Sequence, residues 1–228
     1  PAYELHSIEP GQIAVVAVSP GDGISKIFAS LGVAAIVSGG QTMNPSTEEI
    51  LHAFEDLPTE NVIILPNNKN IILAADTAKT LSTKNVQVLQ SKNIAQGLSA
   101  LLRLSPDGDI DDVFAEMQEA ITEVDCGEIT IATRTVEIDG VSVEEGKYIG
   151  LKNEKLAVAA DELEKTAIEL LHKMEIENRE HITIFYGNNI TEPEVETIAG
   201  KIEETFTNIE VEIHEGGQPH YFMILSIE

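Results

Sequence analysis

"IAVVAVS", residues 13–19, is an apolar run that ends in a serine. An apolar run of this length is typical of a strand buried on both faces, as strands of parallel sheets are. Similar runs recur at 33–40, 61–66 and 85–90, and each run is followed by a helical pattern, at 24–32, 44–57, 67–81 and 94–104. This alternation predicts an α/β lobe over residues 1–104, built on a four-stranded, parallel, doubly wound sheet.

Residues 105–228 follow a different pattern. After a helix near residues 113–124, the segment "EITIATRTVEIDG" alternates like a strand, and its Asp139–Gly140 pair is a hairpin signal. We expect a long helix over Lys155–Met174, and then a strand, a helix and two closing strands at 181–187, 192–206, 209–216 and 220–228. The second lobe is therefore predicted to be mixed α/β with an antiparallel element.

Composition and charge narrow the kinds of core and the classes of partner that the chain can have. Hydrophobic residues make up 43% of the 228 residues but aromatic residues only 4%, so the core should be aliphatic. The net charge of −25 disfavours nucleic acid and anionic membranes as partners. Residues 1–104 hold 9 acidic and 6 basic residues, and residues 105–228 hold 30 and 8, which gives net charges of −3 and −22. The acidic excess serves either solubility or the steering of a basic partner.

Cellular location is inferred from what the sequence lacks. One cysteine, Cys126, leaves no internal disulfide, and we expect it to be buried and structural. We find no apolar run long enough to span a membrane and no signal segment, so we expect a cytoplasmic protein without membrane insertion. Because the chain begins at Pro1, we expect it to be a piece of a longer protein.

The turns after the predicted strands are the candidate site. "SGGQTMNPSTEE", residues 38–49, carries more glycine, amide and hydroxyl groups than a simple turn requires, and "PNNKN" follows the third strand. The carboxyl ends of parallel strands meet at one rim, where helix N-termini offer free N–H groups to anions. The alternative is that each polar residue only caps a helix. The candidate binding residues are Gly39, Gly40, Gln41, Thr42, Asn44, Asn67, Asn68, Lys69 and Asn70.

Catalytic machinery is sparse. The six histidines are scattered without metal-ligand spacing, and "PGDG" at residues 20–23 has neither Walker nor dinucleotide spacing. We therefore assign no catalytic residue, no metal and no cofactor to this chain, and it remains open whether the chain takes part in chemistry.

"GGQTMNPST", "LPNNKNI" and "AQGLSALL" in the first lobe resemble the C-terminal region of dihydroxyacetone-kinase-like proteins, namely the kinase subunit of bacterial fatty acid kinase. "TRTVEIDGVSVEEGKYIGLKNEKL" and the terminal "GGQPHYFMILSIE" fit the same region, so the resemblance covers essentially the whole chain. It implies a two-lobed fold similar to the fatty-acid-binding and dihydroxyacetone-binding proteins. It also implies that ATP and magnesium bind to a separate N-terminal domain.

In the family that the chain resembles, ATP phosphorylates a fatty acid that a separate protein holds, which yields an acyl phosphate for phospholipid synthesis. The hypothesis is that the rim docks this acyl-loaded fatty-acid-binding protein, and that replacing Asn67 and Asn68 with alanine weakens docking without unfolding the chain. Two alternatives remain open: the rim binds a small carboxylate or phosphate directly, or the domain is structural and dimerises the full-length subunit. A histidine that holds substrate in dihydroxyacetone-binding proteins has no counterpart that we can match here.

Overall fold

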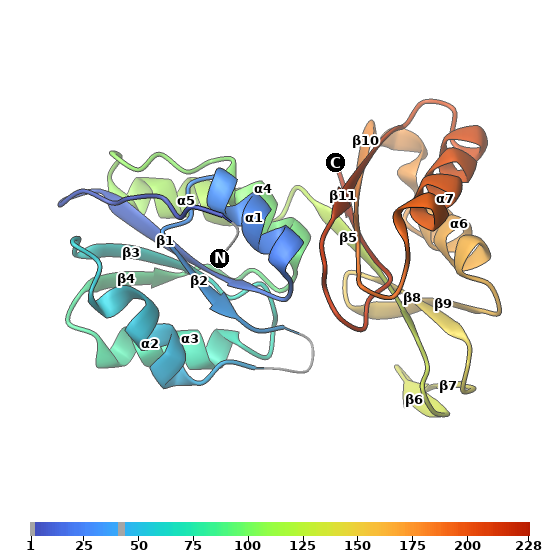
Figure 1. Ribbon diagram of the computed structural model, residues 1–228, viewed down its shortest axis with the longest axis horizontal. Coiled ribbons are helices and arrows are strands. Elements are labelled where there is room, and N and C mark those ends of the chain that lie inside the picture. Colours follow the sequence, from blue (N-terminus) through green and yellow to red (C-terminus); the bar gives the residue numbers. More distant parts are fainter. Residues whose placement is uncertain (1–2, 41–43) are drawn as a thin grey trace. The chain divides into compact units, whose positions relative to one another are not determined.

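The computed structural model describes residues 3–40 and 44–228, which form two compact units, Pro1–Glu123 and Val124–Glu228 (Figure 1). Each unit has its own sheet, and the two are described separately below.

The first unit is built on a sheet of four parallel strands in the order β2-β1-β3-β4. All seven residues of β1 are buried, as its apolar run predicts for a strand covered on both faces. The strands are β1 (Ile13–Ser19), β2 (Ala35–Ser38), β3 (Asn61–Leu65) and β4 (Asn85–Val88).

Five helices cover both faces of this sheet, which confirms the doubly wound prediction. Helices α2 and α3 lie on one face and α1, α4 and α5 on the other (Figure 1). Phe54 of α2 and Ala75 of α3 pack with Val16 of β1 and Ile64 of β3 in one hydrophobic cluster. The helices are α1 (Asp22–Ser30), α2 (Thr47–Glu55), α3 (Ile72–Leu81), α4 (Ile94–Leu101) and α5 (Ile110–Ala120).

Helix α5 belongs to the first unit, so the two units divide after Glu123 rather than at the expected boundary between residues 104 and 105. The Ser99 hydroxyl of α4 donates to Ala120 O at 3.1 Å, and the Arg103 guanidinium pairs with the Glu123 carboxylate at 3.1 Å. At the edge of the sheet, Gln90 N donates to Gln118 Oε1 at 3.1 Å. The Pro–Asp–Gly turn before α5 therefore lies within the unit rather than between the units.

The second unit contains a six-stranded mixed sheet in the order β11-β10-β12-β5-β8-β9, as the sequence predicted in outline. Its pairs are antiparallel except for β10 with β11, which is parallel. The strands are β5 (Asp125–Ile131), β8 (Tyr148–Lys152), β9 (Lys155–Ala160), β10 (His181–Tyr186), β11 (Glu210–Glu215) and β12 (Met223–Ile227).

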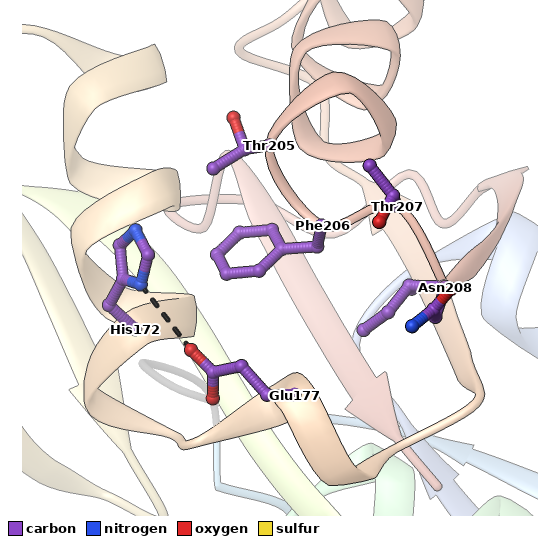
Figure 2. Close-up of a pocket in the computed structure, with 7 residues that line it drawn as sticks. His172, Glu177, Thr205, Phe206, Thr207 and Asn208 are labelled. Atoms are coloured by element: carbon purple, nitrogen blue, oxygen red, sulfur yellow. Dashed lines mark ion pairs between the residues drawn. The ribbon is translucent and has the colours of Figure 1, made fainter.

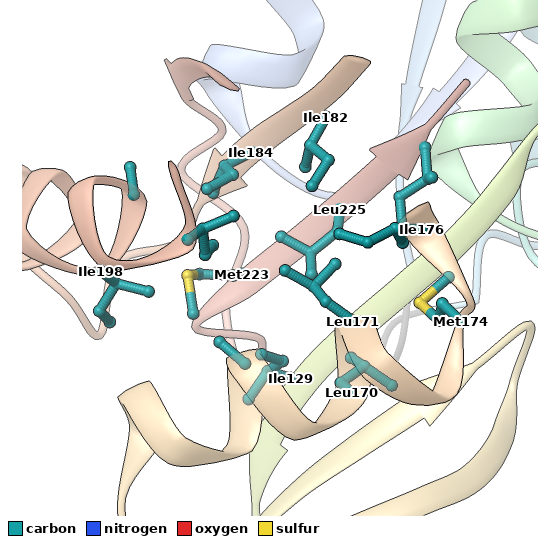
Figure 3. Packing of buried hydrophobic residues seen from close by; sticks show 14 of the residues in the cluster. Ile129, Leu170, Leu171, Met174, Ile176, Ile182, Ile184, Ile198, Met223 and Leu225 are labelled. Atoms are coloured by element: carbon teal, nitrogen blue, oxygen red, sulfur yellow. The ribbon is translucent and has the colours of Figure 1, made fainter. Parts of the chain in front are cut away.

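Helices α6 (Leu163–Lys173) and α7 (Glu192–Thr205) pack on the sheet of the second unit. Figure 3 shows Leu171 of α6 facing Leu225 of β12, with Ile198 of α7 beside Met223, and Leu170 belongs to the same cluster. The core of the second unit is thus almost entirely aliphatic and thioether, as the low aromatic content requires.

The hairpin expected at Asp139–Gly140 is present, between β6 (Val136–Ile138) and β7 (Val141–Val143). Asp139 (φ 52°) and Gly140 (φ 78°) both have left-handed backbone, as the central residues of a type I′ hairpin turn do. The side chain of Asp139 accepts a hydrogen bond from Leu156 N at 2.7 Å, which ties the hairpin to β9.

The prediction of a long helix over Lys155–Met174 was wrong in its first third. Residues Lys155–Ala160 form strand β9, and the helix begins only at Leu163. The left-handed residues Asn153 (φ 46°) and Glu154 (φ 70°) turn the chain back so that β9 pairs with β8. The alanine-rich segment has the intrinsic preference of a helix, but pairing with β8 and burial of Val158 override it.

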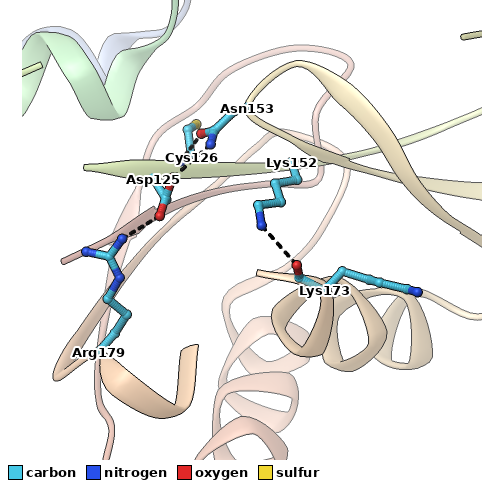
Figure 4. A network of polar contacts seen from close by, with 6 residues as sticks. All are labelled: Asp125, Cys126, Lys152, Asn153, Lys173 and Arg179. Carbon is cyan, nitrogen blue, oxygen red and sulfur yellow. Dashed lines mark hydrogen bonds and ion pairs between the residues drawn. The ribbon is translucent and has the colours of Figure 1, made fainter. Parts of the chain in front are cut away.

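A polar network holds the start of β5 (Figure 4). Asn153 Nδ2 donates to Asp125 Oδ1 at 2.7 Å, and its Oδ1 accepts from Cys126 N at 2.8 Å. The Arg179 guanidinium contacts Asp125 Oδ2 at 2.5 Å, and Lys152 Nζ donates to Lys173 O at 3.1 Å. Cys126 is buried, as expected, and its backbone N–H takes part in this network.

Candidate functional site

The four turns that follow the strands of the first unit converge, as the parallel topology requires. Asn67 Nδ2, after β3, donates to Val18 O of β1 at 2.9 Å, and Asn67 N donates to Ser91 Oγ, after β4, at 3.0 Å. After β2, Gly39 N donates to Ser19 O at 3.0 Å. These hydrogen bonds join all four turns into one surface, which we call the rim: residues 19–21, 38–40, 66–70 and 89–93.

Asn67 is the central residue of the rim. It is buried and has left-handed backbone (φ 54°), a conformation that asparagine tolerates better than most residues. Among the described residues, no hydrogen-bond donor reaches its buried Oδ1. That oxygen instead faces the backbone of Gly97 in α4, where an added Cβ would lie 2.1 Å from it. Gly97 is therefore required for the side chain of Asn67 to fit.

The side-chain amides near Asn67 also form hydrogen bonds that stabilise the loops of the rim. The side-chain oxygen of Asn68, which is buried, accepts from Asn70 N at 2.9 Å, and Ile71 N donates to Asn68 O at 3.0 Å. These two bonds shape the turn that leads into α3. Asn93 caps α4 by accepting from Gln96 N at 2.9 Å. The capping interpretation is thus right for Asn93.

The structure separates the candidate binding residues into three groups. Gly39, Asn67 and Asn68 are buried, and Gly40 is half-buried against Pro20, whose Cβ would lie 2.7 Å from an added Cβ. Gln41 and Thr42 lie outside the described residues. The exposed members are Asn44, Lys69 and Asn70, and Lys92 of the neighbouring turn is exposed as well.

The electrostatics of the rim differ from those of the rest of the chain. Residues 61–106, which supply β3, α3, β4 and α4, carry a single acidic residue, Asp76. The same segment carries five of the fourteen basic residues, namely Lys69, Lys79, Lys84, Lys92 and Arg103. Only Lys69 and Lys92 of these five lie at the rim, because Lys79, Lys84 and Arg103 lie at the opposite ends of α3, β4 and α4. In a chain of net charge −25, these two exposed lysines favour an anionic group at the rim.

Sequence reasoning missed the groups that fix the rim, namely Val18 O, the Ser91 hydroxyl and Gly97. It also missed a second buried amide, Gln218 of the second unit, although Gly-Gly-Gln occurs in both halves. Gln218 Nε2 donates to Phe185 O at 2.8 Å, and its Oε1 faces Gly216, where an added Cβ would lie 2.0 Å away. The Gly-Gly-Gln motif, which occurs in both halves of the sequence, was the signal that could have drawn attention to Gln218.

Potential metal ligands are dispersed. Within residues 3–40 and 44–228, no cluster of three or more His, Cys, Asp or Glu side chains has the arrangement of a metal site. Within the same ranges, no helix is both long enough and apolar enough to cross a membrane.

The fold defines a class of two-unit α/β proteins. Over 98% of its length, the chain superposes on 49% of a dihydroxyacetone kinase chain from C. freundii with a TM-score of 0.64 and 16% identity. It also superposes, over 95% of its length, on 99% of the Streptococcus pneumoniae fatty acid kinase B3 protein, solved with linoleic acid, with a TM-score of 0.57 and 13% identity. Identities this low show the shared fold alone.

The sequence itself gives the family. Residues 14–228 match the family model for the C-terminal region of FakA-like fatty acid kinase subunits. An uncharacterized protein of Staphylococcus aureus (strain USA300) is 37% identical in an alignment of 229 positions, which covers 99% of this chain and 42% of that protein. The chain belongs to this FakA-like C-terminal family, which confirms the resemblance seen in the sequence. It spans less than half the length of the Staphylococcus aureus relative.

Proposed function

We propose that this chain is the part of a fatty acid kinase that docks an acyl-loaded fatty-acid-binding protein. The docked partner would present its fatty acid carboxylate to an ATP- and magnesium-binding domain outside this chain, which would form the acyl phosphate. Family membership supports the assignment of the chain to a fatty acid kinase. The observation that carries docking itself is the rim, where four turns meet and where Lys69, Asn70 and Lys92 are exposed in a positively charged segment.

Positioning explains why a docking surface would matter to the rate. Phosphoryl transfer requires the attacking oxygen in line with the leaving group, and orientation accounts for much of its catalysis. A rim locked by buried hydrogen bonds is a rigid platform, so little ordering entropy is lost when a partner binds. Its exposed lysines would attract a carboxylate or an acyl phosphate at the surface of the partner.

The buried amides change how the proposal should be tested. Asn67 and Asn68 are already committed to internal hydrogen bonds, so replacing them would disturb the platform as well as any contact. The exposed residues Asn44, Lys69 and Asn70, with Lys92, are the ones whose side chains lie at the surface, where a partner can reach them.

The test is titration calorimetry of this chain with a linoleate-loaded fatty acid kinase B protein at low and moderate salt. We expect saturable binding that weakens as salt rises, because charged groups make the contact. The same protein heated in advance and shown to be unfolded is the control. No saturable heat at either salt concentration would contradict docking by this chain.

A second candidate function is direct binding of a small carboxylate or phosphate at the rim. It is favoured by the same exposed Lys69 and Lys92, which lie just before α3 and α4. Binding to the folded state raises the unfolding temperature, and the rise grows with ligand concentration. Stabilisation by acetyl phosphate without any partner, lost in a Lys69→Ala variant, would favour this function over docking.

A further inference from the structure

The second unit contains a cavity of about 200 Å³ where the C-terminal ends of α6 and α7 meet (Figure 2). His172 comes from the last turn of α6, Glu177 from the short helix η1 (Ile176–Asn178), and Thr205 and Phe206 from the end of α7. Ile209, which also lines the cavity, directly precedes β11. The cavity thus lies at the amino ends of β10 and β11, away from the Gly-Gly-Gln turn that follows β11.

Aromatic and acidic groups face each other across this cavity. The His172 and Phe206 rings lie 4.8 Å apart at 56°, and Glu177 Oε1 lies 3.6 Å from His172 Nδ1. Figure 2 shows the Phe206 ring between the His172–Glu177 pair on one side and Thr207 with Asn208 on the other. Phe206 is only 6% exposed, so the cavity offers mainly the exposed ring of His172, one carboxylate and several hydrogen-bonding side chains.

The electrostatics select a positively charged ligand. A helix carries partial negative charge at its C-terminal end, and two such ends meet here. The end of α6 already has one cation, since Lys152 Nζ donates to Lys173 O at 3.1 Å. The flanking segments, residues 169–180 and 203–212, hold eight acidic residues and two basic ones, Lys173 and Arg179. Arg179 already contacts Asp125, at 2.5 Å. An anion would be repelled from such a site.

The chemistry of the lining narrows the class of cation. A metal ion is disfavoured, because His172 and Glu177 alone do not form a ligand cluster among the described residues. A planar guanidinium fits better, since it can stack on an aromatic ring while it donates two hydrogen bonds to one carboxylate. A primary ammonium has the charge but not the planar shape.

We propose that this cavity binds an organic cation, with a guanidinium group as the preferred ligand, held by Glu177 against the exposed His172 ring. The guanidinium could belong to a small free molecule or to an arginine side chain of another protein. This inference does not depend on docking at the rim, because it concerns other residues and other charges.

The test follows the amide NMR signals of residues 172–177 and 205–209 in the whole chain while agmatine is added. We expect saturable shifts confined to these residues. A neutral alkyl urea of similar shape should produce no saturable shift, because it lacks the charge. Glu177→Gln should weaken agmatine binding roughly tenfold through the loss of a charged hydrogen bond. Glu196→Gln, which removes the same charge from the exposed side of α7, should leave the affinity unchanged.

A second arm distinguishes the two sources of the cation. A capped peptide with one arginine is titrated beside agmatine, and the tighter ligand identifies a protein side chain or a free molecule as the natural class. Two results would overturn the proposal: shifts that do not saturate with either ligand, or equal affinities in wild type and Glu177→Gln. Because only small probes are used, these results are independent of whether any partner docks at the rim.

Discussion

Asn67 in the first unit and Gln218 in the second lock strand ends in similar ways, but they come from different places in the chain. Asn67 follows β3 directly and donates to Val18 O of β1, whereas Gln218 lies between β11 and β12 and donates to Phe185 O of β10. Each amide is buried, and each turns its oxygen towards a glycine. We call each buried amide, with the hydrogen bond that it donates to a strand, a lock. The lock of the parallel sheet comes from the turn after the central strand β3, and that of the mixed sheet comes from the connection between β11 and β12.

Short motifs that recur in both halves of the sequence lie in different environments in the two units. Both halves carry Asn-Asn after a strand, but Asn188, the counterpart of Asn67 in that motif, is exposed, and its backbone N–H donates to Gln218 O at 3.1 Å. The shared motifs therefore do not mark shared roles. Buried amides in such turns stabilise the loops, which is why we assign the proposed partner contact to their exposed neighbours.

The largest effect is expected for Gly187→Ala. An added Cβ would lie 2.1 Å from Tyr221 O and 2.5 Å from Gln218 O, and backbone atoms cannot move aside as a side chain can. We expect the free energy of unfolding to fall by about 4 kcal/mol. Urea unfolding followed by circular dichroism measures the loss, and hydrogen exchange should place it in residues 124–228.

The control for that substitution is Gly200→Ala in α7, where an added Cβ meets no atom within 4 Å. It should stabilise the protein by up to about 1 kcal/mol, because alanine favours a helix over glycine. Gly187→Ala with near wild-type stability would mean that the turn around Gln218 is not tightly packed.

In the first unit, Gly97→Ala should cost less, about 2 kcal/mol, because its obstacle is the Asn67 side chain rather than backbone. The Asn67 amide can shift only by lengthening its hydrogen bond to Val18 O. Hydrogen exchange should therefore report faster exchange at the rim and unchanged exchange in the second unit. Equal losses from Gly97→Ala and Gly187→Ala would remove the distinction between the two locks.

The amides themselves can be compared directly through Asn67→Gly and Gln218→Ala. Glycine keeps the left-handed backbone accessible at residue 67, so each variant removes mainly the amide. We expect each to lose about 2 kcal/mol, because a buried carbonyl is left without its donor. Denaturant unfolding of both variants provides the measurement, and a loss in only one of them would show that the two locks are not equivalent.

The smallest effects are expected at helix starts. In α2, Ser46 and Glu49 form a reciprocal capping box, since Glu49 N donates to Ser46 Oγ at 3.1 Å and Ser46 N donates to Glu49 Oε2 at 2.7 Å. In α7, the Thr191 backbone N–H and hydroxyl both donate to Glu194. Ser46→Ala should destabilise by about 1 kcal/mol and Thr191→Ala by less, as measured by thermal unfolding.

These boxes also have a pH dependence of known sign. Hydrogen bonds from Ser46 lower the pKa of the Glu49 carboxyl, and those from Thr191 lower the pKa of Glu194. A carboxylate with a lowered folded-state pKa stabilises the fold above its unfolded pKa and loses that contribution as the pH falls through the folded value. The stability gap between wild type and Glu49→Gln should therefore narrow at acid pH, because the backbone N–H of Ser46, the main cause of the lowered pKa, then faces no carboxylate in either protein. A widening gap would contradict this assignment.

The sequence predicted the first unit well because each element there carries its own local signal. The apolar run of β1 and the caps at Ser46 and Asn93 can be read without knowledge of distant contacts. Strand β9 could not be predicted in this way, since its alanine-rich segment becomes a strand only by pairing with β8. The sequence also could not predict that Asn67 is buried while Lys69 is exposed, because the environment of Asn67 depends on Val18 O and Gly97, which are distant in sequence.

The exposed, positively charged part of the rim is where we expect the acyl-loaded partner to bind, and one affinity comparison decides whether it does. The double variant Lys69→Glu/Lys92→Glu is compared with Lys165→Glu/Lys201→Glu, which makes the same charge change on exposed lysines of the second unit. We predict that the rim variant binds a linoleate-loaded fatty acid kinase B protein at least about tenfold more weakly than the second-unit variant. Equal affinities, or a greater loss in the second-unit variant, would contradict docking through the rim.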